Sequence, residues 1–460
     1  MGMEQINHLV ILMMENRSFD HYLGALTLGA EAVRHPDVEG LGDGHGNLRT
    51  DLPVNLLSGK PVRSWQLDDP AWNDRPDPPW TKDKRDRWIV DPKSVDPPHE
   101  WPEVHTQFAD GALTGFVSAY QKAFKQKKGK TIPPEVARLV MGYYTRATLP
   151  VLYVLADEFA VCDHWFSSFL GSTWPNRIFV NAGHCGDLVS TDDLLARYQK
   201  VFPKFIWEAW GQPRPHARQF TWKAYFFKER EEFTMFDLWP YTHVGHSEHG
   251  ADIAQFSRDC QAGTLPDVSI VEPNYDLFAD HPWEDPRLGQ HFISGVVNAL
   301  LHSPSWQDTA LVLTYDEHGG FFDHVVPPEA PERNPDEKFK YLGLRVPTIV
   351  MSPYTPKGVT VKDPFDHTAL LKSVADRWGF AAPGPRAPRL QPIWSSGPNL
   401  CFDFDQPPRD GNQIVIPDAD LGLTDDDIIR AAARPPNDLS LALWQVHRTS
   451  QLEELKRPPA

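Results

Sequence analysis

Hydrophobic residues gather along this chain in four short, nearly uninterrupted runs, and polar residues follow each run at once. The runs are Ile6–Met14, Val268–Val271, Ala310–Tyr315 and Val346–Met351. Apolar runs of this length without alternation are typical of strands that are buried on both faces. Ligands of open α/β sheets bind at the carboxyl ends of the strands. The four runs therefore predict a sheet whose polar segments form a binding site at that edge.

Helical periodicity fills the intervals between the predicted strands. Apolar residues recur three and four positions apart in Leu149–Glu158, Gly289–His302 and Asp366–Trp378. Strands that alternate with helices indicate a mostly parallel sheet sandwiched by helices, so we expect an α/β fold. The sequence shows no internal repeat.

Two parts of the chain depart from this alternation. Residues 31–110 are rich in Asp, Pro, Trp and Gly, which predicts a loop-rich insertion. The composition changes again after residue 380, so we divide the chain into a main domain, 1–380, and an appendage, 381–460, packed on it. Within the appendage we expect a Pro-rich extended stretch and two helices, over 381–418, Thr424–Ala433 and Asp438–Leu455.

The net charge of −17 restricts the partners of the chain. A nucleic-acid-binding protein needs a basic face to displace counterions, so we expect no nucleic-acid partner. The same charge opposes electrostatic docking on anionic membranes. It also repels anionic substrates, so a phosphate site would have to be locally positive or loaded with metal. One Lys-rich tract, Lys122–Lys130, is interpreted as a solvated linker.

The cysteines and the lengths of the apolar runs add further limits. Cys162, Cys185, Cys260 and Cys401 lack the spacing of metal ligands, and we expect buried small side chains, with one disulfide as the alternative. No run approaches the roughly 20 apolar residues of a transmembrane helix, so none is expected. We expect a cytoplasmic protein as the sequence is written, or a secreted or periplasmic one if a leader was removed. The oligomeric state stays open.

Two pairs of oxygen-bearing residues follow predicted strands. Glu15-Asn16 comes after the first strand and is either a helix cap or part of a hard-cation site. Asp316-Glu317 comes after the third strand. Adjacent carboxylates beside a buried strand are unfavourable unless something cationic stands between them and other acids. A metal ion would remove that difficulty.

A hydroxyl residue and several histidines complete the candidate chemistry. Thr173 lies two residues before Pro175 and is expected at a helix N-terminus, where free backbone N–H groups attract phosphate. Arg177, one helical turn further on, is expected to support the same anion. The alternative is an ordinary helix cap. Four histidines in polar settings are candidates as a group, although a single histidine is more often structural: His99, His281, His318 and His367.

These residues belong to longer strings that occur in order along the chain. The strings are Glu-Asn-Arg-Ser-Phe-Asp at 15–20, Ser-Thr-Trp-Pro-Asn-Arg at 172–177, Glu-Pro at 272–273, His-Pro at 281–282, Asp-Glu-His-Gly-Gly-Phe-Phe-Asp-His at 316–324 and Phe-Asp-His-Thr at 365–368. With them, residues 6–380 resemble the bacterial phosphoesterase family of non-haemolytic phospholipases C and respiratory-burst-inhibiting acid phosphatases. Plant non-specific phospholipase C is similar. The last 80 or so residues show no clear resemblance.

The resemblance implies an alkaline-phosphatase-like core and hydrolysis of phosphate esters. Thr173 matches the nucleophile of the family. The metal-ligand positions match Glu15, Asn16, Asp316 and Glu317, with the Thr173 hydroxyl. His99 and His281 resemble histidines that contact phosphate or the leaving group, whereas His318 and His367 fit more loosely. The chain departs from the family at His164-Trp165, where an Asp-aromatic pair is commoner, and it begins almost at the first strand.

The chemistry of the residues agrees with phosphoryl transfer. A threonine hydroxyl is a weak nucleophile until metal coordination lowers its pKa, so we expect one divalent cation and a phospho-Thr173 intermediate. Oxygen ligands favour Ca²⁺, Mg²⁺ or Mn²⁺ over Zn²⁺. Water would then cleave the intermediate with a histidine as acid and base, and we assign this role to His281.

The expected reaction is phospholipase C-type cleavage of a phosphodiester, with a phospholipid or a small phosphate ester as substrate. An acid phosphatase acting on monoesters and a non-catalytic phosphate-binding module are the alternatives, although the latter would be expected to lack a ligand residue. Several of the 16 tryptophans lie between 65 and 101, which suits a hydrophobic or choline-binding rim as well as core packing. A sulfatase is excluded, because threonine cannot form the required aldehyde.

Overall fold

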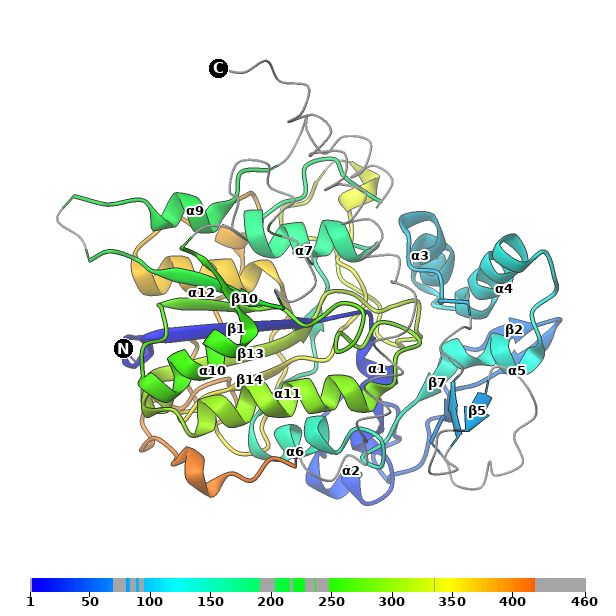
Figure 1. Ribbon diagram of the computed structural model, residues 1–460. Coiled ribbons are helices and arrows are strands. Elements are labelled where there is room, and N and C mark those ends of the chain that lie inside the picture. The colour runs from blue at the N-terminus through cyan, green and yellow to red at the C-terminus, as the bar shows by residue number, and fades with distance from the viewer. Residues whose placement is uncertain are drawn as a thin grey trace, which may run out of the picture.

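A central eight-stranded sheet organises the computed structural model, which describes residues 2–68, 80–82, 88–90, 95–190, 203–215, 218–227, 236, 248–334 and 336–417. The strand order is β11-β10-β12-β1-β13-β14-β8-β15 (Figure 1). In that order the strands are Gly250–Asp252, Trp222–Phe226, Val268–Val271, His8–Met14, Thr309–Tyr315, Ile349–Met351, Ala160–Cys162 and Thr360–Val361. Neighbours pair in parallel except at β14, so the mostly parallel α/β sheet is confirmed.

The two central strands, β1 and β13, are buried along almost their whole length. Every residue of β13 is buried, as is every residue of β1 except His8, which is half-buried. A strand in this position contacts helices on both faces, which explains why its sequence is apolar without alternation. The hydrophobic runs therefore predicted the centre of the sheet correctly.

The fourth predicted strand runs against its neighbours. Only the last three residues of the run Val346–Met351 form β14, which is antiparallel to both β13 and β8. Its carboxyl end therefore points to the opposite edge of the sheet. Ser352 and Pro353 are the polar segment that follows this run. The expectation that they share an edge with the other polar segments is wrong, because a hydrophobic run does not encode the direction of its strand.

Helices cover both faces of the sheet, with α7 and α12 on one face and α10 and α11 on the other (Figure 1). The helices around the sheet are α6 (Pro150–Glu158), α7 (Thr173–Ala182), α9 (Ile206–Gly211), α10 (Ile253–Ala262), α11 (Pro286–Leu301) and α12 (Thr368–Trp378). All three predicted helices are present. The Asp285 side chain caps α11 and lets it begin earlier than expected. Asp366 lies instead in β16 (Phe365–Asp366), which pairs with β9 (Trp165–Phe166).

A lobe of short elements lies beyond the carboxyl end of β1 (Figure 1). It contains β2 (Asn55–Leu57), β3 (Lys60–Val62), β4 (Trp65–Gln66), β5 (Trp80–Lys82), β6 (Trp88–Val90), α3 (Trp101–Phe108), α4 (Phe116–Lys128), α5 (Pro134–Ala137) and β7 (Gly142–Tyr143). The insertion 31–110 thus supplies ordered elements, including α3. The short helices α1 (Phe19–Tyr22) and α2 (Glu31–Arg34) connect β1 to this lobe.

The expectation of a solvated linker over Lys122–Lys130 is wrong, because most of this tract belongs to α4. The first half of the helix buries apolar side chains that include Phe116, Val117 and Tyr120. Its lysines extend from the second half into solvent. Composition alone favoured a linker, because the packing residues precede the lysines in the sequence.

The described part of the C-terminal stretch packs on the main core. In residues 381–417 the side chains of Ile393, Trp394 and Phe402 are buried, and Arg386 pairs with Asp366 of β16. The helices expected at Thr424–Ala433 and Asp438–Leu455 lie outside the described residues. Over the described ranges, no helix combines the length and the apolar character that crossing a bilayer requires.

All four cysteines are buried and carry free thiols. This agrees with the expectation of small buried side chains. The thiols of Cys162 and Cys401 lie 3.8 Å apart and form no disulfide.

Candidate active site

The ends of β1 and β13 bring together residues that lie 300 positions apart. Met14 pairs with Tyr315 in the parallel ladder, and the N–H of Asp316 donates to the carbonyl oxygen of Met14 at 3.1 Å. Glu15 and Asp316 therefore leave the sheet side by side. The strand register alone creates the acidic centre that the sequence predicted.

The turn after β1 depends on an asparagine and a glycine. Asn16 has a φ of 56°, a left-handed conformation that asparagine adopts more readily than most residues. Its backbone N–H donates to Oδ1 of Asp316 at 2.9 Å. Gly319 lies directly against this turn, because a Cβ there would stand 1.9 Å from the carbonyl oxygen of Asn16. The close approach explains why the sequence requires glycine after Asp316-Glu317-His318.

Thr173 is the first residue of α7, and its hydroxyl points to the strand ends. Oγ1 lies 3.1 Å from the side-chain amide of Asn16. Ser172 precedes the helix in an extended conformation. The amide of Asn176 donates to three carbonyl oxygens in residues 169–172, which fixes the turn before the helix. The helix N-terminus and the acidic centre thus meet at one hydroxyl.

Arg177 lies one turn along α7, but its guanidinium contacts acids. It lies 2.8 Å from Glu272, 3.1 Å from Glu15 and 3.2 Å from Asp316, and its side chain is fully buried. Burial opposes its charge, but these carboxylates and Tyr275 raise the pKa of Arg177 well above its ordinary value. The sequence predicted that Arg177 would support a bound anion. The structure places it beneath the site as the counter-charge of three carboxylates, because helical spacing does not set the direction of a long side chain.

Negative charge at the site exceeds what Arg177 balances. Burial raises the pKa of Glu15 well above its ordinary value. The nearby carboxylates of Asp316, Glu284 and Glu272 raise this pKa further, whereas Arg177 lowers it. Oε2 of Glu15 makes no hydrogen bond within the described part of the chain. Buried carboxylates in excess of their cationic partners favour a bound cation.

The Asn16 side chain lies among the oxygens of three other residues of the site. One atom of its amide lies 3.1 Å from Asp316 Oδ1, 3.2 Å from Glu317 Oε1 and 3.1 Å from Thr173 Oγ1, and the other lies 3.2 Å from Nε2 of His281. Nδ1 of His281 lies 2.9 Å from the Pro282 carbonyl oxygen, so that nitrogen carries a hydrogen.

The Asn16 amide satisfies all of these neighbours when its oxygen accepts a hydrogen bond from Nε2 of His281 and its nitrogen donates to the oxygens of Thr173, Asp316 and Glu317. Three oxygen-bearing side chains thus converge on the Asn16 amide beside the buried carboxylate of Glu15, and oxygen atoms are the ligands that hard divalent cations prefer. The residues present therefore fit a metal ion.

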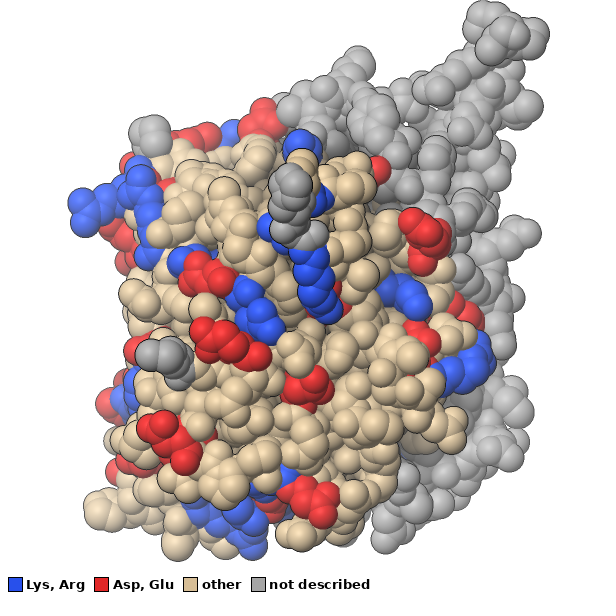
Figure 2. Space-filling model, turned by 90° about the vertical axis from the view of Figure 1, so that its left-hand side faces the viewer, with Lys and Arg blue, Asp and Glu red and all other residues tan. Residues whose placement is uncertain are grey.

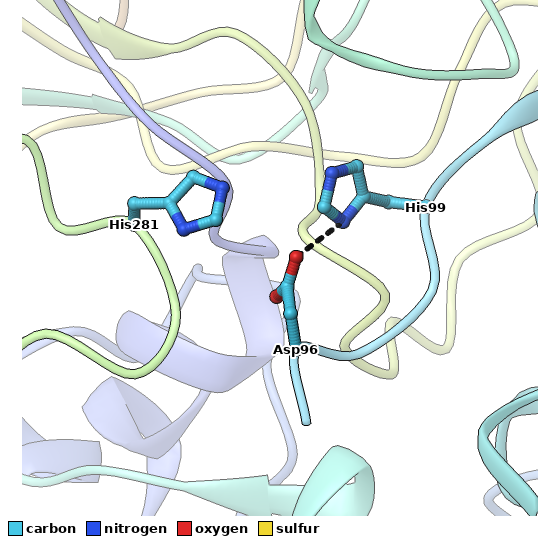
Figure 3. A group of neighbouring side chains, drawn as sticks. All are labelled: Asp96, His99 and His281. Atoms are coloured by element: carbon cyan, nitrogen blue, oxygen red, sulfur yellow. Dashed lines mark ion pairs between the residues drawn. The ribbon is translucent and has the colours of Figure 1, made fainter. Parts of the chain in front are cut away.

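A cavity of about 180 Å³ opens above Thr173. His281 lines it from the loop after β12, and Asp96 and His99 line it from the segment before α3. Figure 3 shows His99 and His281 facing each other from their two loops, with Asp96 beside His99. The two rings lie 6.0 Å apart between centroids, and Nδ1 of His99 lies 3.8 Å from Oδ2 of Asp96. Two of the predicted histidines thus flank the predicted nucleophile.

Without a bound metal, the surroundings of His99 favour its cationic form. Burial favours its neutral form, but the carboxylates of Glu317, Asp96 and Glu100 outweigh burial and raise the pKa of His99 to about 9. Its Nδ1 lies 2.9 Å from the carbonyl oxygen of Pro97, which fixes the ring. The cavity therefore contains a positive group opposite Thr173.

The other two candidate histidines support the site from behind. Nε2 of His318 lies 2.7 Å from the Gln107 side-chain oxygen, and Nδ1 lies 3.0 Å from Glu317 Oε2. Nε2 of His367 lies 2.8 Å from the backbone oxygen of Asp316. Burial lowers the pKa of His367 to about 4. Neither ring lines the cavity, so both act as supports of the two acidic residues.

Three residues of the site were not assigned a role from the sequence. Glu272 follows the predicted strand β12, so its position was a usable signal. Asp96 and Gln107 lie in the irregular insertion, where no pattern indicates which residue turns toward the site.

Two further acidic and histidine clusters are already balanced by arginines. Arg345 contacts Asp20 and Asp323 at 3.0 and 2.9 Å beside His324. Arg146 bridges two acids beside His35 in the same way. These networks hold loops together and contain no excess charge comparable to that near Glu15.

Comparison with known proteins identifies the family. The model of the Phosphoesterase family matches residues 6–381. Phospholipase C B of Mycobacterium tuberculosis is 32% identical over 446 residues, covering 88% of this chain and 79% of that protein. Non-specific phospholipase C1 of Arabidopsis thaliana is 31% identical over 397 residues, covering 80% of this chain and 66% of that protein.

Solved structures with detectable likeness are more distant. The lipoteichoic acid synthase LtaP of Listeria monocytogenes has a TM-score of 0.33 at 12% identity, covering 55% of this chain and 70% of its own. An alkaline phosphatase superfamily protein of Vibrio parahaemolyticus has a TM-score of 0.35 at 9% identity, covering 66% and 82%. Both scores are low, so the α/β fold stands on the sheet described above. The family match and the curated relatives show that the chain belongs to the Phosphoesterase family and is a hydrolase that acts on phosphoric ester bonds.

Proposed function

We propose that this hydrolase cleaves phospholipids as a phospholipase C, through covalent attack by Thr173. One observation carries the proposal: Thr173 Oγ1 lies at the start of α7, in the cavity, 3.1 Å from Asn16 at the strand ends. Relatives named phospholipase C in a bacterium and a plant support a phosphodiester substrate.

One divalent cation belongs to the proposed site. Thr173 and four other oxygen-bearing residues would hold it: Glu15, Asn16, Asp316 and Glu317. Their oxygen atoms favour Ca²⁺, Mg²⁺ or Mn²⁺ over Zn²⁺. When bound, such a cation lowers the pKa of the threonine hydroxyl and offsets the negative charge of the phosphoryl oxygens.

In the first step, Thr173 loses its proton to solvent and its oxygen forms a bond to phosphorus. The bond from phosphorus to the diacylglycerol oxygen breaks. That oxygen departs as an alkoxide and needs a proton, which the cationic ring of His99 can donate. The phosphorylated head group stays on Thr173 as a covalent intermediate.

In the second step, water attacks the same phosphorus atom. One water proton passes to His99, which is neutral after the first step, and the bond from Thr173 to phosphorus breaks. The phosphorylated head group leaves, and Thr173 regains a proton from solvent. The enzyme returns to its starting protonation state.

The proposal gives the proton transfer to His99, whereas the sequence alone favoured His281. Nδ1 of His281 is engaged by the Pro282 carbonyl, and its Nε2 contacts the Asn16 amide. His281 thus sets the direction of the Asn16 amide, and His99 is the ring that carries a transferable proton into the cavity.

Thr173→Ala and Thr173→Ser test the nucleophile, with Ser172→Ala as a control, because Ser172 binds Glu100 and lacks the proposed role. We expect Thr173→Ala to lose several orders of magnitude in turnover with an unchanged Tm. Thr173→Ser and Ser172→Ala should keep most activity. Near-normal turnover by Thr173→Ala would contradict the proposal.

The trapped intermediate and the substrate range test the phospholipase assignment. After acid quenching with phosphatidylcholine, the peptide containing Thr173 should gain the mass of phosphocholine. A parallel comparison uses p-nitrophenyl phosphorylcholine and p-nitrophenyl phosphate with added divalent metals. Turnover of the monoester alone would indicate a phosphatase, and turnover of neither would indicate a binding module.

A further inference from the structure

A group of lysines on and just after α4 extends into solvent beside the cavity. We call Lys122, Lys125, Lys128 and Lys130 the lysine band; all four are exposed. No Asp or Glu occurs between residues 111 and 134. Within the described part of the chain, no residue of the band forms an ion pair. The band is therefore a concentration of uncompensated positive charge.

The rest of the chain has an excess of negative charge. The chain as a whole carries a net charge of −17. On the face turned away from the lobe, Lys and Arg lie interspersed with Asp and Glu (Figure 2). A single-sign cluster of lysines in such a protein creates a strong local field. The band therefore differs from that face in carrying charge of one sign.

The band lies on a helix that lines the cavity. α4 occupies the outer edge of the lobe beside α3 (Figure 1). Ala123, Gln126 and Lys127 of the same helix line the cavity that contains Thr173. A surface that binds the band would consequently face the opening above the nucleophile.

Stabilisation of α4 explains the presence of only some of the lysines in the band. Lysines in the last turn of a helix interact favourably with its dipole, which accounts for Lys125 and Lys128. Lys122 lies too early in α4 for that effect, and Lys130 follows the helix. The lack of any Asp or Glu from residue 111 to residue 134 also exceeds what capping requires.

We propose that the lysine band binds the anionic surface of a phospholipid bilayer and holds the cavity at the lipid. This inference rests on the proposed phospholipase function, since that reaction takes its substrate from a bilayer. Clusters of lysine are attracted to anionic lipids within about 10 Å of the surface. The negative remainder of the molecule is repelled, which orients the cavity toward the bilayer.

The wall of the cavity favours a bilayer over a nucleic acid. Asp96, Glu100 and Glu103 line the cavity together with Thr173 and residues of α4. A polyanionic strand that extended from the band into the site would meet these carboxylates. A zwitterionic phospholipid carries a cationic amine and avoids this repulsion.

Binding is tested first without turnover, in the Thr173→Ala background. The band variant is Lys122→Gln/Lys125→Gln/Lys128→Gln, which keeps good helix formers on α4. The control removes as many positive charges elsewhere, by Lys204→Gln/Arg258→Gln/Lys338→Gln at exposed positions. Each protein is sedimented with vesicles of phosphatidylcholine alone, or with vesicles of phosphatidylcholine that contain about 30% phosphatidylglycerol and therefore have a negative surface potential.

We expect the parent protein to bind the phosphatidylglycerol vesicles and to release them in about 1 M salt. The band variant should bind roughly 10- to 100-fold more weakly, whereas the control should stay within about twofold of the parent. Equal losses in both variants would overturn the inference. So would unchanged binding by the band variant, or binding to duplex DNA in place of vesicles.

Activity separates this inference from the proposed function. The band variant with Thr173 intact should hydrolyse soluble p-nitrophenyl phosphorylcholine normally, and it should lose phosphatidylcholine hydrolysis only in the anionic vesicles. Band-dependent vesicle binding without phospholipid hydrolysis would refute the phospholipase and still support the binding surface. Full hydrolysis in anionic vesicles by the band variant would refute the surface alone.

Discussion

Nε of Arg177 lies 3.2 Å from Oδ2 of Asp316, so the helix that begins at Thr173 is joined to the residue that ends β13. The same guanidinium reaches Glu15 after β1 and Glu272 after β12. One side chain thus connects three strand ends to the helix of the nucleophile. Its charge offsets the three carboxylates, and its position joins the three strand ends to the helix that carries Thr173.

Arg177→Met should reduce the free energy of unfolding by about 3–5 kcal/mol, because it leaves buried carboxylates without their partner. Added divalent cation should restore more of the Tm in this variant than in the parent, since the ion supplies positive charge beside the same acids. Urea denaturation with and without metal measures both effects. Arg258→Met, at an exposed position of α10, is the control. A loss no larger than that of the control would contradict the assigned role.

Removal of the metal should abolish activity and lower the Tm. The purified protein should contain about one divalent cation per chain, and chelation followed by addition of Ca²⁺, Mg²⁺, Mn²⁺ or Zn²⁺ identifies the ion that restores turnover. Glu317→Gln should weaken metal binding in calorimetry, whereas Glu337→Gln, at an exposed carboxylate, should not. Full activity in a demonstrably metal-free sample would exclude the proposed site.

The two cavity histidines should respond differently to the leaving group. His99→Gln should slow phosphatidylcholine cleavage by roughly 10²- to 10⁴-fold, because the diacylglycerol alkoxide needs a proton. It should slow p-nitrophenyl phosphorylcholine much less, because p-nitrophenolate leaves without one. His281→Ala should slow both substrates equally, through the Asn16 amide. The reverse pattern would return the acid role to His281.

The pH profile should report the charge of His99. Donation requires its protonated ring, so kcat/KM falls as the pH rises through the pKa of His99, about 9 without bound metal. A bound cation opposes protonation and moves this fall to lower pH. Asp96→Asn removes a carboxylate that raises the same pKa, so it should move the fall lower still. If Asp96→Asn leaves this fall of kcat/KM at the same pH, Asp96 does not raise the pKa of His99.

Folding stability should also depend on a buried neutral histidine. Burial, assisted by Arg17, lowers the pKa of His21 well below its ordinary value of 6.5. Below that pH the unfolded chain binds a proton that the folded chain does not, so stability falls as the pH decreases. His21→Gln removes the group, and its unfolding free energy should fall less steeply below pH 6.5, by up to about 1.4 kcal/mol per pH unit. Parallel curves for both proteins would contradict this.

The sequence predicted those parts of the molecule that depend on local pattern. Continuous apolar runs indicated β1 and β13, and polar residues after them indicated the acidic centre. The direction of β14 was not predictable, because parallel and antiparallel strands share the same hydrophobicity. α4 was hidden, since its packing residues precede the lysines that dominate its composition.

Side-chain direction was the second limit. Helical spacing placed Arg177 near Thr173, but only the tertiary arrangement of three carboxylates turns its guanidinium away from the cavity. Asp96 and Gln107 could not be assigned, because they reach the site from a segment without periodicity. Glu272 could have been assigned a role from the sequence, because it follows β12 directly, as Glu15 follows β1 and Asp316 follows β13.

The site divides between two parts of the chain. The register of β1 and β13 sets the reaction centre, while His99 and the cavity wall come from the lobe beyond the sheet. A chimera that exchanges residues 95–128 for those of a relative would keep every residue of the β1–β13 ladder. The part of the site that admits the ester and protonates its leaving group can therefore diverge between members of the family while the acidic centre at the strand ends is kept.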